Sequence, residues 1–556
     1  MTAPVRVSVL MPVYNTPEVT LRAAIRSALS QRASFELVVV DDASTSPAVG
    51  RVLAEVERHP RVRVLRRESN GGIVKASDDA LAAARGEFVA LLDHDDLLAL
   101  DCLEEVERVL DQYADVDYVY TDEDKISDSG EHFDVFAKPD WSPERLRCQM
   151  YTGHLSVIRT SLAREVGGFD ERAEGSQDHD LVLRVTERAR RVVHIPRVLY
   201  HWRAIRGSVA MDETVKPYAH DAGLAAVQRH VERVGIQGTA CSTELAHTYR
   251  VVRHLDPSVL VSIVIPTRGT SALVWGERRC MVVELVRSIL QLSTHRNIEI
   301  VVVYDRPTPQ EVLDELTRLG GPQMRLVLFD EPFNFSAKCN VGLLAASAEH
   351  VVFLNDDMEV VSPDFLAQLV GPLSEDGVGA TGARLLFADG TLQHGGHVYE
   401  SGDLTHAGLG APGDDEGPFR AYRVSRECSG LTAACLATTR RVMDEVGGFC
   451  EGLPGNFNDV DLSYKIRAQG YRMLWIADAT LYHFESVSRD PTVHSWEYTF
   501  VMDRWGTPDT DPYFPGGSQV RPARGTLDTA RAAVRLLRRE GVGAVWSKVR
   551  SRVSQR

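Results

Sequence analysis

Short apolar runs and amphipathic stretches alternate along most of this chain. The runs are rich in valine, isoleucine and leucine, which is typical of strands buried on both faces of a sheet. The amphipathic stretches repeat apolar side chains every three or four positions, as a helix packed on a sheet does. The runs occupy residues 37–40, 88–92, 298–303 and 350–354, and helical periodicity is clear at 21–29 and 103–110. This alternation predicts an α/β fold with mostly parallel sheets.

The chain contains two copies of one pattern. The apolar run that starts at Val7 recurs from Val261, and His201 recurs as His483. The offset grows from 254 to 282 residues while the order of the motifs is kept, which indicates a duplicated domain with insertions. Each copy is long enough to hold its own core. We therefore predict a first domain at residues 1–205, a connector at 206–257, a second domain at 258–507 and a tail at 508–556.

The connector and the tail differ in character. The connector is patterned rather than flexible, with a predicted helix from Tyr218 to about Val234 and an extended stretch at 249–253. Residues 521–556 hold ten arginine and lysine residues against Asp528 and Glu540, with apolar residues at helical spacing. A basic amphipathic helix of this kind fits peripheral contact with the inner face of the cytoplasmic membrane. A helix that docks on the protein itself would show the same pattern.

Composition limits the functions open to the chain. Its 556 residues carry 78 acidic and 62 basic side chains, and the net charge of −16 argues against a nucleic-acid partner. No apolar run approaches the length of a membrane-spanning helix, and residues 1–6 lack the pattern of a secretory signal. The eight cysteines form no CxxC pair, which predicts reduced thiols. We therefore expect a cytoplasmic protein.

Carboxylates follow the predicted strands. Asp93 and Asp95 come directly after the run at 88–92, and Asp356 and Asp357 follow the run at 350–354. In sheets of this class, ligands bind beyond the carboxyl ends of the strands. Paired carboxylates there suit Mg²⁺ or Mn²⁺, which take few protein oxygens and leave room for phosphate and water. A single acidic turn would be an ordinary helix cap, but its recurrence favours a metal site.

A second acidic constellation recurs further along each copy. Asp178 and Asp459 each open a predicted helix, which runs to residue 190 in the first copy and to residue 468 in the second. A histidine follows 23 residues after the first aspartate and 24 residues after the second, at His201 and His483. Helix capping explains one aspartate but not the repeated histidine.

Together these residues resemble the inverting family 2 glycosyltransferases, which have the GT-A fold. The resemblance covers residues 5 to about 205 and 258 to about 507 and rests on motifs in family order. These are Met11-Pro-Val-Tyr-Asn15, Ile265-Pro-Thr-Arg-Gly269, Val38-Val-Val-Asp-Asp-Ala-Ser44, the DxD turn, the two Gly-Gly-Phe segments and the two Asp-x-Asp-Leu helices. More narrowly, residues 138–143, 175–180 and 333–336 look like two-domain enzymes that make bacterial O-antigen, rhamnan and related surface polysaccharides.

The resemblance implies transfer of a sugar from a nucleoside diphosphate sugar to a hydroxyl, with inversion and with Mn²⁺ or Mg²⁺. Asp178 and Asp459 match the catalytic base. The implied metal ligands are Asp93, Asp95, His201, Asp357 and His483. The implied nucleotide-sugar contacts are Pro12, Tyr14, Asp41, Asp42, Asp93, Pro266, Asp305, Asn355 and Asp356. The implied acceptor side includes Gly168, Phe169, Asp180, Gly448, Phe449 and Asp461. The family context suggests a glycan or a polyprenyl-diphosphate-linked saccharide as the acceptor.

The second copy departs from the first. Asn355 stands where the first copy has Asp93, so metal binding in the second copy depends more heavily on Asp357. Tyr304-Asp305 replaces Asp41-Asp42 on the side of the donor base. We expect both copies to be transferase sites. The alternative is one active copy, with the other a non-catalytic scaffold or saccharide-binding module.

An insertion at residues 386–424 also distinguishes the second copy. It contains His394, His397 and His406, and three close histidines raise the question of zinc. The glycine-rich, acidic surroundings and the irregular spacing favour a loop over the acceptor side instead.

Other enzyme classes fit less well. Residues 377–382 satisfy GxGxxG, but a helical segment precedes them and a strand follows, the reverse of the dinucleotide-binding order. The P-loop and GxSxG patterns are missing from the sequence. A glycoside hydrolase would need paired carboxylates but no nucleotide site, which leaves the strand-end acids unexplained.

Overall fold

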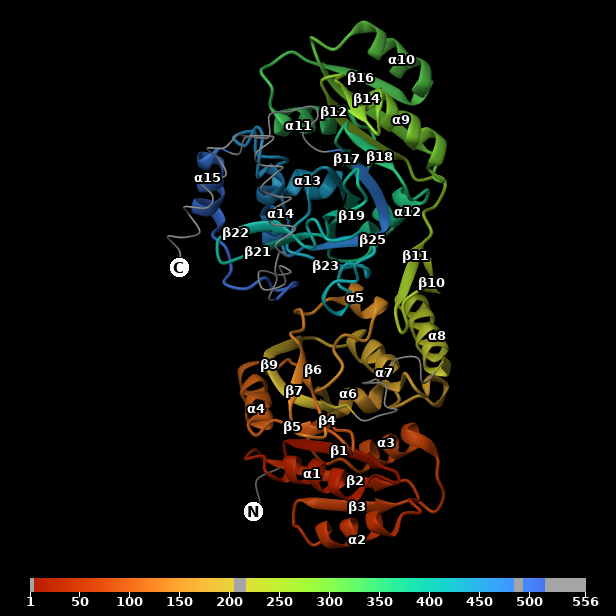
Figure 1. The fold of residues 1–556 in the computed structure, drawn as a ribbon, viewed down its shortest axis with the longest axis vertical. Helices are drawn as coiled ribbons and strands as arrows, with labels where there is room; N and C mark the ends of the chain where they lie inside the picture. The colour runs from red at the N-terminus through yellow and green to blue at the C-terminus, as the bar shows by residue number, and fades with distance from the viewer. Residues whose placement is uncertain (1–4, 205–216, 485–493, 516–556) are drawn as a thin grey trace. The chain divides into compact units, whose positions relative to one another are not determined.

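Each copy of the repeated pattern forms one mixed sheet in the computed structural model, which describes residues 5–204, 217–484 and 494–515 (Figure 1). The strand orders are β3-β2-β1-β4-β8-β6-β9-β5 and β16-β15-β12-β17-β24-β19-β25-β18. Strands that correspond in the sequence repeat occupy corresponding places in the two sheets, so the copies share one topology. The predicted α/β class is confirmed.

The first copy begins with parallel strands and continues with antiparallel ones. Its strands are β1 (Val7–Val13), β2 (Phe35–Asp41), β3 (Val62–Arg66), β4 (Phe88–Leu91), β5 (Leu97–Leu98), β6 (Tyr118–Ile126), β7 (His132–Phe136), β8 (Ser156–Arg159) and β9 (Val192–Arg203). Its helices are α1 (Glu18–Leu29), α2 (Pro47–Val56), α3 (Gly72–Ala83), α4 (Cys102–Gln112), α5 (Pro143–Cys148), α6 (Thr160–Glu165) and α7 (Gln177–Thr186). Strands β1 to β4 pair in parallel, whereas β8 pairs antiparallel with both β4 and β6.

Both faces of the first sheet are covered. Val9 and Met11 of β1 pack in one apolar cluster, and Leu10 between them packs in another. Every residue of β1 and β2 is buried. Successive side chains of a strand point to opposite faces, so burial on both faces explains why these strands are apolar throughout rather than alternating.

The second copy repeats this arrangement with additions. Its strands are β12 (Val261–Thr267), β13 (Ser271–Val274), β14 (Glu277–Cys280), β15 (Ile298–Asp305), β16 (Met324–Phe329), β17 (His350–Leu354), β18 (Met358–Val360), β19 (Val378–Leu386), β20 (Leu392–His394), β21 (His397–Glu400), β22 (Asp403–His406), β23 (Arg426–Glu427), β24 (Cys435–Thr439) and β25 (Arg472–His483). Its helices are α9 (Met281–Leu292), α10 (Gln310–Gly320), α11 (Phe335–Ala345), α12 (Phe365–Val370), α13 (Arg440–Val446), α14 (Asn458–Ala468) and α15 (Ser495–Trp505). The GxGxxG match at residues 377–382 lies mostly within β19 and therefore does not connect a strand to a helix, as a dinucleotide-binding loop would.

The connector contains α8 (Pro217–Arg233), followed by a hairpin of β10 (Gly238–Ser242) and β11 (Tyr249–Arg253). The predicted helix and extended stretch are therefore confirmed. Helix α7, however, ends at Thr186 rather than at residue 190. The reason is Asp117, whose carboxylate accepts hydrogen bonds from the backbone N–H and the side chain of Arg190 and draws the chain into β9.

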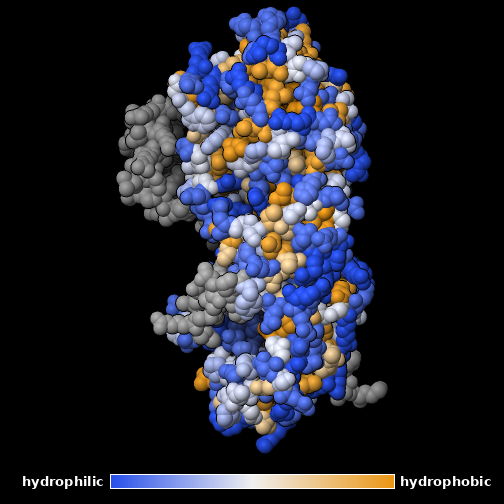
Figure 2. Space-filling view, turned by 90° about the vertical axis from the view of Figure 1, so that its right-hand side faces the viewer, coloured by the Kyte–Doolittle hydropathy of each residue, from blue (hydrophilic) through white to orange (hydrophobic). Residues whose placement is uncertain are grey.

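No helix among the described residues is long and apolar enough to cross a membrane. On the face seen in Figure 2, hydrophobic residues form separate groups among hydrophilic ones. The eight cysteines are all free thiols. The basic segment 521–556 lies outside the described residues, so its helical periodicity stays a prediction.

Candidate active sites

The predicted site residues gather at the carboxyl ends of parallel strands. Asp41 is the last residue of β2 and Asp305 is the last residue of β15. Asp93 and Asn355 follow closely after β4 and β17. Because β1 pairs in parallel with β2 and β4, and β12 with β15 and β17, these side chains meet at one edge of each sheet. Sheets of this class bind their ligands at that edge.

In the first copy, Asp178 lies near the DxD turn. Burial raises the pKa of the Asp178 carboxyl to about 6, and the negative charge of Asp93 adds to this effect, while His154 opposes it. The amide of Gln177 donates a hydrogen bond to Asp178 at 3.3 Å. A carboxylate that titrates close to neutral pH is suited to accept a proton during a reaction.

His154 completes this site, and the sequence reasoning missed it. Ligand atoms of Asp93, Asp96 and His154 lie within 4.8 Å of one another. Asp96 is buried and accepts hydrogen bonds from the Tyr200 hydroxyl at 2.6 Å and from the backbone N–H of Arg203 at 2.7 Å. His154 belongs to a loop before β8 and is not part of the recurring motifs, so only its place in the fold identifies it.

In the first copy, His201 contacts a carboxylate outside the predicted set of metal ligands. The Nδ1 of His201 lies 2.6 Å from Asp124, whose other carboxylate oxygen lies 2.9 Å from the Nδ1 of His132. The Asp95 side chain is partly buried, with 28% of its surface exposed. This partial burial is the main cause that raises the pKa of its carboxyl. Its backbone carbonyl accepts a hydrogen bond from the Arg203 side chain.

The two histidines also differ in strand register. In the first copy, His201 pairs with Leu97, which lies two residues after Asp95. In the second copy, His483 pairs with Met358, which lies one residue after Asp357. The two histidines therefore occupy the same place in the sequence pattern but have different pairing positions and different side-chain partners.

The second copy does bring its predicted metal ligands together. The Nε2 of His483 lies 3.2 Å from a carboxylate oxygen of Asp357 and 3.3 Å from the Asn355 amide nitrogen. The Nδ1 of His483 lies 2.7 Å from the Gln393 amide oxygen, which can only accept a hydrogen bond. Nδ1 therefore donates this hydrogen bond, and Nε2 faces Asp357 and the Asn355 amide. This is how a second hydrogen bond orients a metal-binding histidine.

The second catalytic candidate, Asp459, is held by the backbone. Its carboxylate accepts hydrogen bonds from the N–H groups of Val460 at 2.9 Å and Ala433 at 3.3 Å, and it lies 4.0 Å from the Nε2 of His397. The neighbouring Ala434 accepts a hydrogen bond from the backbone N–H of Asn355. Adjacent residues thus link the Asp459 carboxylate to the turn that carries the metal ligands.

The aspartates expected on the nucleotide side have different partners in the two copies. Asp42 accepts hydrogen bonds from the backbone N–H groups of Gly71 and Gly72, both at 2.8 Å, and pairs with Arg67. Asp305 instead pairs with the buried Lys338 at 2.8 Å, a residue that the sequence reasoning missed.

The remaining nucleotide-side residues line the same strand ends. The Asp41 carboxylate accepts a hydrogen bond from the Ser44 N–H at 3.0 Å. Burial raises the pKa of Asp356 to about 6, with a further contribution from Asp357. Pro12 and Pro266 are buried near the ends of β1 and β12, and Tyr14, just after β1, is exposed.

Comparison with known families agrees with this arrangement. The model of the family described as glycosyl transferase family 2 matches residues 8–167 and 262–427, together more than half of the chain. The chain belongs to glycosyl transferase family 2. It is an enzyme of that family, with two tandem GT-A domains.

This glycosyltransferase spans about half the length of the two relatives described next. An uncharacterized protein of Sinorhizobium fredii, y4gI, is 40% identical over 525 residues, which cover 91% of this chain and 57% of the relative. The O-antigen biosynthesis protein RfbC of Myxococcus xanthus is 34% identical over 516 residues, which cover 91% of this chain and 40% of RfbC. Among solved structures, residues 1–349 of S. aureus TarS in complex with UDP-GlcNAc match with a TM-score of 0.33 at 20% identity, covering 41% of this chain and 73% of TarS.

In this glycosyltransferase, the Gly-Gly-Phe segments have equivalent anchors. The backbone N–H of Phe169 donates to Asp78 at 2.7 Å, and that of Phe449 donates to Asn340 at 2.9 Å. Gly168 and Gly448 both have positive φ, of 68° and 69°, which favours glycine. Both glycines also pass close to the anchoring side chain. Their contact with an acceptor stays a prediction.

Asp180 and Asp461 were expected on the acceptor side, but neither is exposed to solvent. Asp180 pairs with Arg184 and with Arg229 of α8 at 2.6 and 2.8 Å. Asp461 pairs with Lys465 at 3.3 Å and, in α15, with the Arg504 guanidinium at 3.1 Å and the Trp505 indole N–H at 2.9 Å. Each aspartate therefore anchors a helix that comes later in the chain, and its contact with an acceptor stays a prediction.

Proposed function

We propose that this chain transfers sugars from nucleoside diphosphate sugars to a hydroxyl of a glycan acceptor, with inversion, at two sites. The observation that carries the proposal is a carboxylate next to the strand-end turn in both copies. In the first copy, the charge of Asp93 acts on Asp178. In the second copy, Ala433 and Ala434 link Asp459 to Asn355.

The proposed role of Asp178 and Asp459 is that of general base. Such a group takes the acceptor hydroxyl proton as the oxygen attacks the anomeric carbon. A pKa of about 6 leaves Asp178 mostly ionised at neutral pH and still able to bind a proton. Two backbone N–H groups hold the Asp459 carboxylate in place. Its side chain is partly exposed, so an acceptor hydroxyl can approach it.

The residues of the second copy fit a divalent cation. An Asp357 carboxylate oxygen and His483 Nε2 lie 3.2 Å apart, and together they offer a donor set suited to Mn²⁺ or Mg²⁺ beside a diphosphate. When bound, such an ion neutralises charge on the leaving diphosphate. In the first copy, Asp93, Asp96 and His154 offer a comparable set, and Asp95 lies close by.

The acceptor is proposed from the relatives. The two-copy organisation matches RfbC, which is named for O-antigen biosynthesis, over 91% of this chain. We therefore infer that the chain acts in cell-surface polysaccharide synthesis, on a glycan or a polyprenyl-diphosphate-linked saccharide at the inner membrane face. The net charge of −16 fits a protein with no nucleic-acid partner.

The test uses a panel of nucleoside diphosphate sugars with Mn²⁺ or Mg²⁺ and measures release of nucleoside diphosphate, with and without EDTA. Wild type, Asp178→Asn and Asp459→Asn are compared for each donor. If both copies are active, each variant loses the release that depends on its own copy. If every donor gives the same release with and without EDTA, the metal-dependent transfer is contradicted.

A single active copy remains the alternative function, and one observation favours it. Asn355 replaces Asp93, and the two copies place their histidines on different partners. On this alternative, one of the two aspartate variants behaves as wild type with every donor and acceptor tested. The silent copy would then serve as a scaffold or saccharide-binding module.

A further inference from the structure

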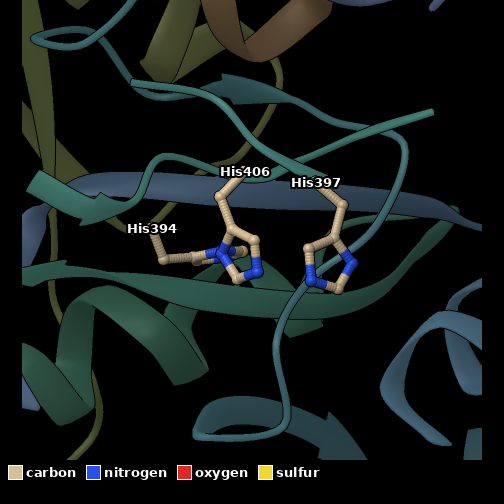
Figure 3. Close-up of side chains that lie close together, drawn as sticks. All are labelled: His394, His397 and His406. Atoms are coloured by element: carbon tan, nitrogen blue, oxygen red, sulfur yellow. The ribbon is translucent and has the colours of Figure 1, made fainter. Parts of the chain in front are cut away.

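Three histidines that are separated in the sequence meet in the second copy. His394 ends β20, His397 begins β21 and His406 ends β22. Their ring centroids are 4.8, 4.8 and 5.2 Å apart, with the rings edge to face (Figure 3). One ring nitrogen from each lies within 4.8 Å of the others. Strands β21 and β22 pair directly, with His397 opposite His406, so backbone hydrogen bonds fix two of the three ligands.

The cluster is enclosed by the protein. His394 is 0% exposed and His397 is 4% exposed, whereas His406 is partly exposed. The Nδ1 atoms of His394 and His406 lie 2.7 Å apart, and the Nδ1 of His397 lies 2.8 Å from the Tyr399 hydroxyl. The indole N–H of Trp475 donates to the backbone carbonyl of His394 at 3.1 Å, which fixes the end of β20.

The three imidazoles supply the nitrogen ligands of a candidate metal site. An imidazole binds a transition metal through one ring nitrogen. The Nδ1 atoms of His394 and His406 are in contact, and the backbone N–H of Thr432 lies 3.4 Å from His394 Nε2. Three imidazoles at one place form the protein part of a common tetrahedral site.

The two glycines between His394 and His397 explain how the third histidine approaches. A Cβ at Gly395 would lie 2.6 Å from the backbone oxygen of Ala407, the residue next to His406. Gly396 has φ of 89°, and its carbonyl accepts a hydrogen bond from the Ala407 N–H at 2.9 Å. Any side chain at position 395 would therefore push the end of β22 away.

We propose that His394, His397 and His406 form a binding site for a divalent transition metal ion of the imidazole-preferring class, with Zn²⁺ as the ion used to probe it. Zinc–nitrogen bonds of about 2.0–2.1 Å place two ligand nitrogens about 3.3 Å apart. The 2.7 Å contact between His394 and His406 opens to that value with a small rotation of either ring. The site differs in chemistry from the carboxylate-containing pair Asp357 and His483, which suits harder cations.

The proposed metal site also supports the active site. Strand β20 carries Gln393 next to His394, and Gln393 accepts the hydrogen bond from His483 Nδ1. On the other side, His397 lies 4.0 Å from the Asp459 carboxylate. An ion held by β20, β21 and β22 would thus fix the insertion between His483, the proposed ligand, and Asp459, the proposed base. The metal-binding inference itself does not depend on that function.

The test measures metal bound to the full chain, purified without a polyhistidine tag. Chelator-treated protein is refilled with Zn²⁺ or Co²⁺, dialysed, and analysed by elemental analysis, visible absorption of Co²⁺ and thermal unfolding. The expected result is retained zinc, a tetrahedral Co²⁺ spectrum and a higher melting temperature. Failure of the refilled wild-type chain to retain either ion would overturn the proposal without any variant.

Variants assign the site. His406→Gln and His394→Gln should each retain one equivalent of zinc less than wild type, whereas Asp357→Asn should retain the same amount. His295→Gln is the matched control, because His295 is a buried histidine outside the cluster that bonds only the Val259 carbonyl. Gly395→Ala keeps all three ligands and should still weaken binding at least tenfold. Undiminished zinc in both His394→Gln and His406→Gln would contradict the assignment.

Discussion

The two copies share a topology and a set of motifs, yet their sites are connected differently. In the first copy, Asp178 is close to Asp93 and has a pKa raised to about 6, and the predicted ligand His201 contacts Asp124. In the second copy, the corresponding His483 contacts Asp357 and is oriented by Gln393. A duplicated motif therefore fixes the place of a residue along a strand but not the partner that its side chain contacts.

The insertion adds a second difference. Gln393 and the three histidines all belong to residues 386–424 of the second copy. In the first copy, a loop histidine, His154, lies beside Asp93 and Asp96 instead. The lesson is that tandem copies can keep their acidic residues while the groups that orient those residues come from unrelated segments.

The largest expected effect comes from the bases. Asp178→Asn should lower transfer by the first copy about 10²- to 10⁴-fold, because it removes the proton acceptor. The same change removes a buried carboxylate with a raised pKa, so it should stabilise the protein by about 1–2 kcal/mol at pH 7. Steady-state kinetics and thermal unfolding measure the two effects. A loss of activity with a loss of stability would indicate a structural role instead.

The sign of that stability effect follows from the pKa shift. The folded protein binds the Asp178 proton up to about pH 6, whereas the unfolded chain releases it near the ordinary value of 3.8. Stability therefore falls as the pH rises through this window, and Asp178→Asn abolishes that part of the fall.

Removal of the buried helix anchors should have the next largest effect. Asp180→Ala leaves Arg184 and Arg229 without their shared partner, and we expect the free energy of unfolding to fall by about 3 kcal/mol. Asp461→Ala should cost less, because its partner Arg504 is 42% exposed and is screened by water. Calorimetry of the full chain measures both. Equal and negligible shifts would contradict the anchoring role.

The two histidines should separate the copies. His483→Ala is expected to raise the Mn²⁺ concentration needed for half-maximal transfer by the second copy at least tenfold. The reason is that it removes one of the two proposed metal ligands and leaves Asp357. His201→Ala should change the Mn²⁺ dependence of the first copy by less than about threefold, since that imidazole lies on Asp124. Metal titrations of activity in Asp178→Asn and Asp459→Asn backgrounds isolate each copy. Equal effects would show that the register difference has no functional consequence.

The smallest expected effect is on the pH profile. In an Asp459→Asn background, kcat/KM of the first copy should rise about tenfold per pH unit below pH 6 and level off above it, because the base must be ionised. Asp93→Asn should move the midpoint to lower pH, since the negative charge of Asp93 contributes to the raised pKa. An unchanged midpoint would argue that the two carboxylates do not interact in solution.

Much of the fold followed from sequence pattern. Strands buried on both faces are apolar throughout, so β2, β4, β15 and β17 were placed within about three residues of their ends. The prediction extended helix α7 to residue 190, but the helix ends at Thr186. Asp117 bonds Arg190 from a distant part of the chain, and periodicity does not reveal such a contact. The strand-end acids were found by their recurrence, and their position at the sheet edge follows from parallel pairing.

The family, the duplication and the acidic residues could be inferred from the sequence, because these depend on local pattern and on order along the chain. Only the three-dimensional structure shows that His201 contacts Asp124, that Asp180 and Asp461 are buried, and that His154 lies beside Asp93. It also assembled the three histidines of the insertion, whose irregular spacing argued against a metal site. Such contacts depend on strand register and on loop packing between distant segments, and neither is fixed by the residues next to them in the chain.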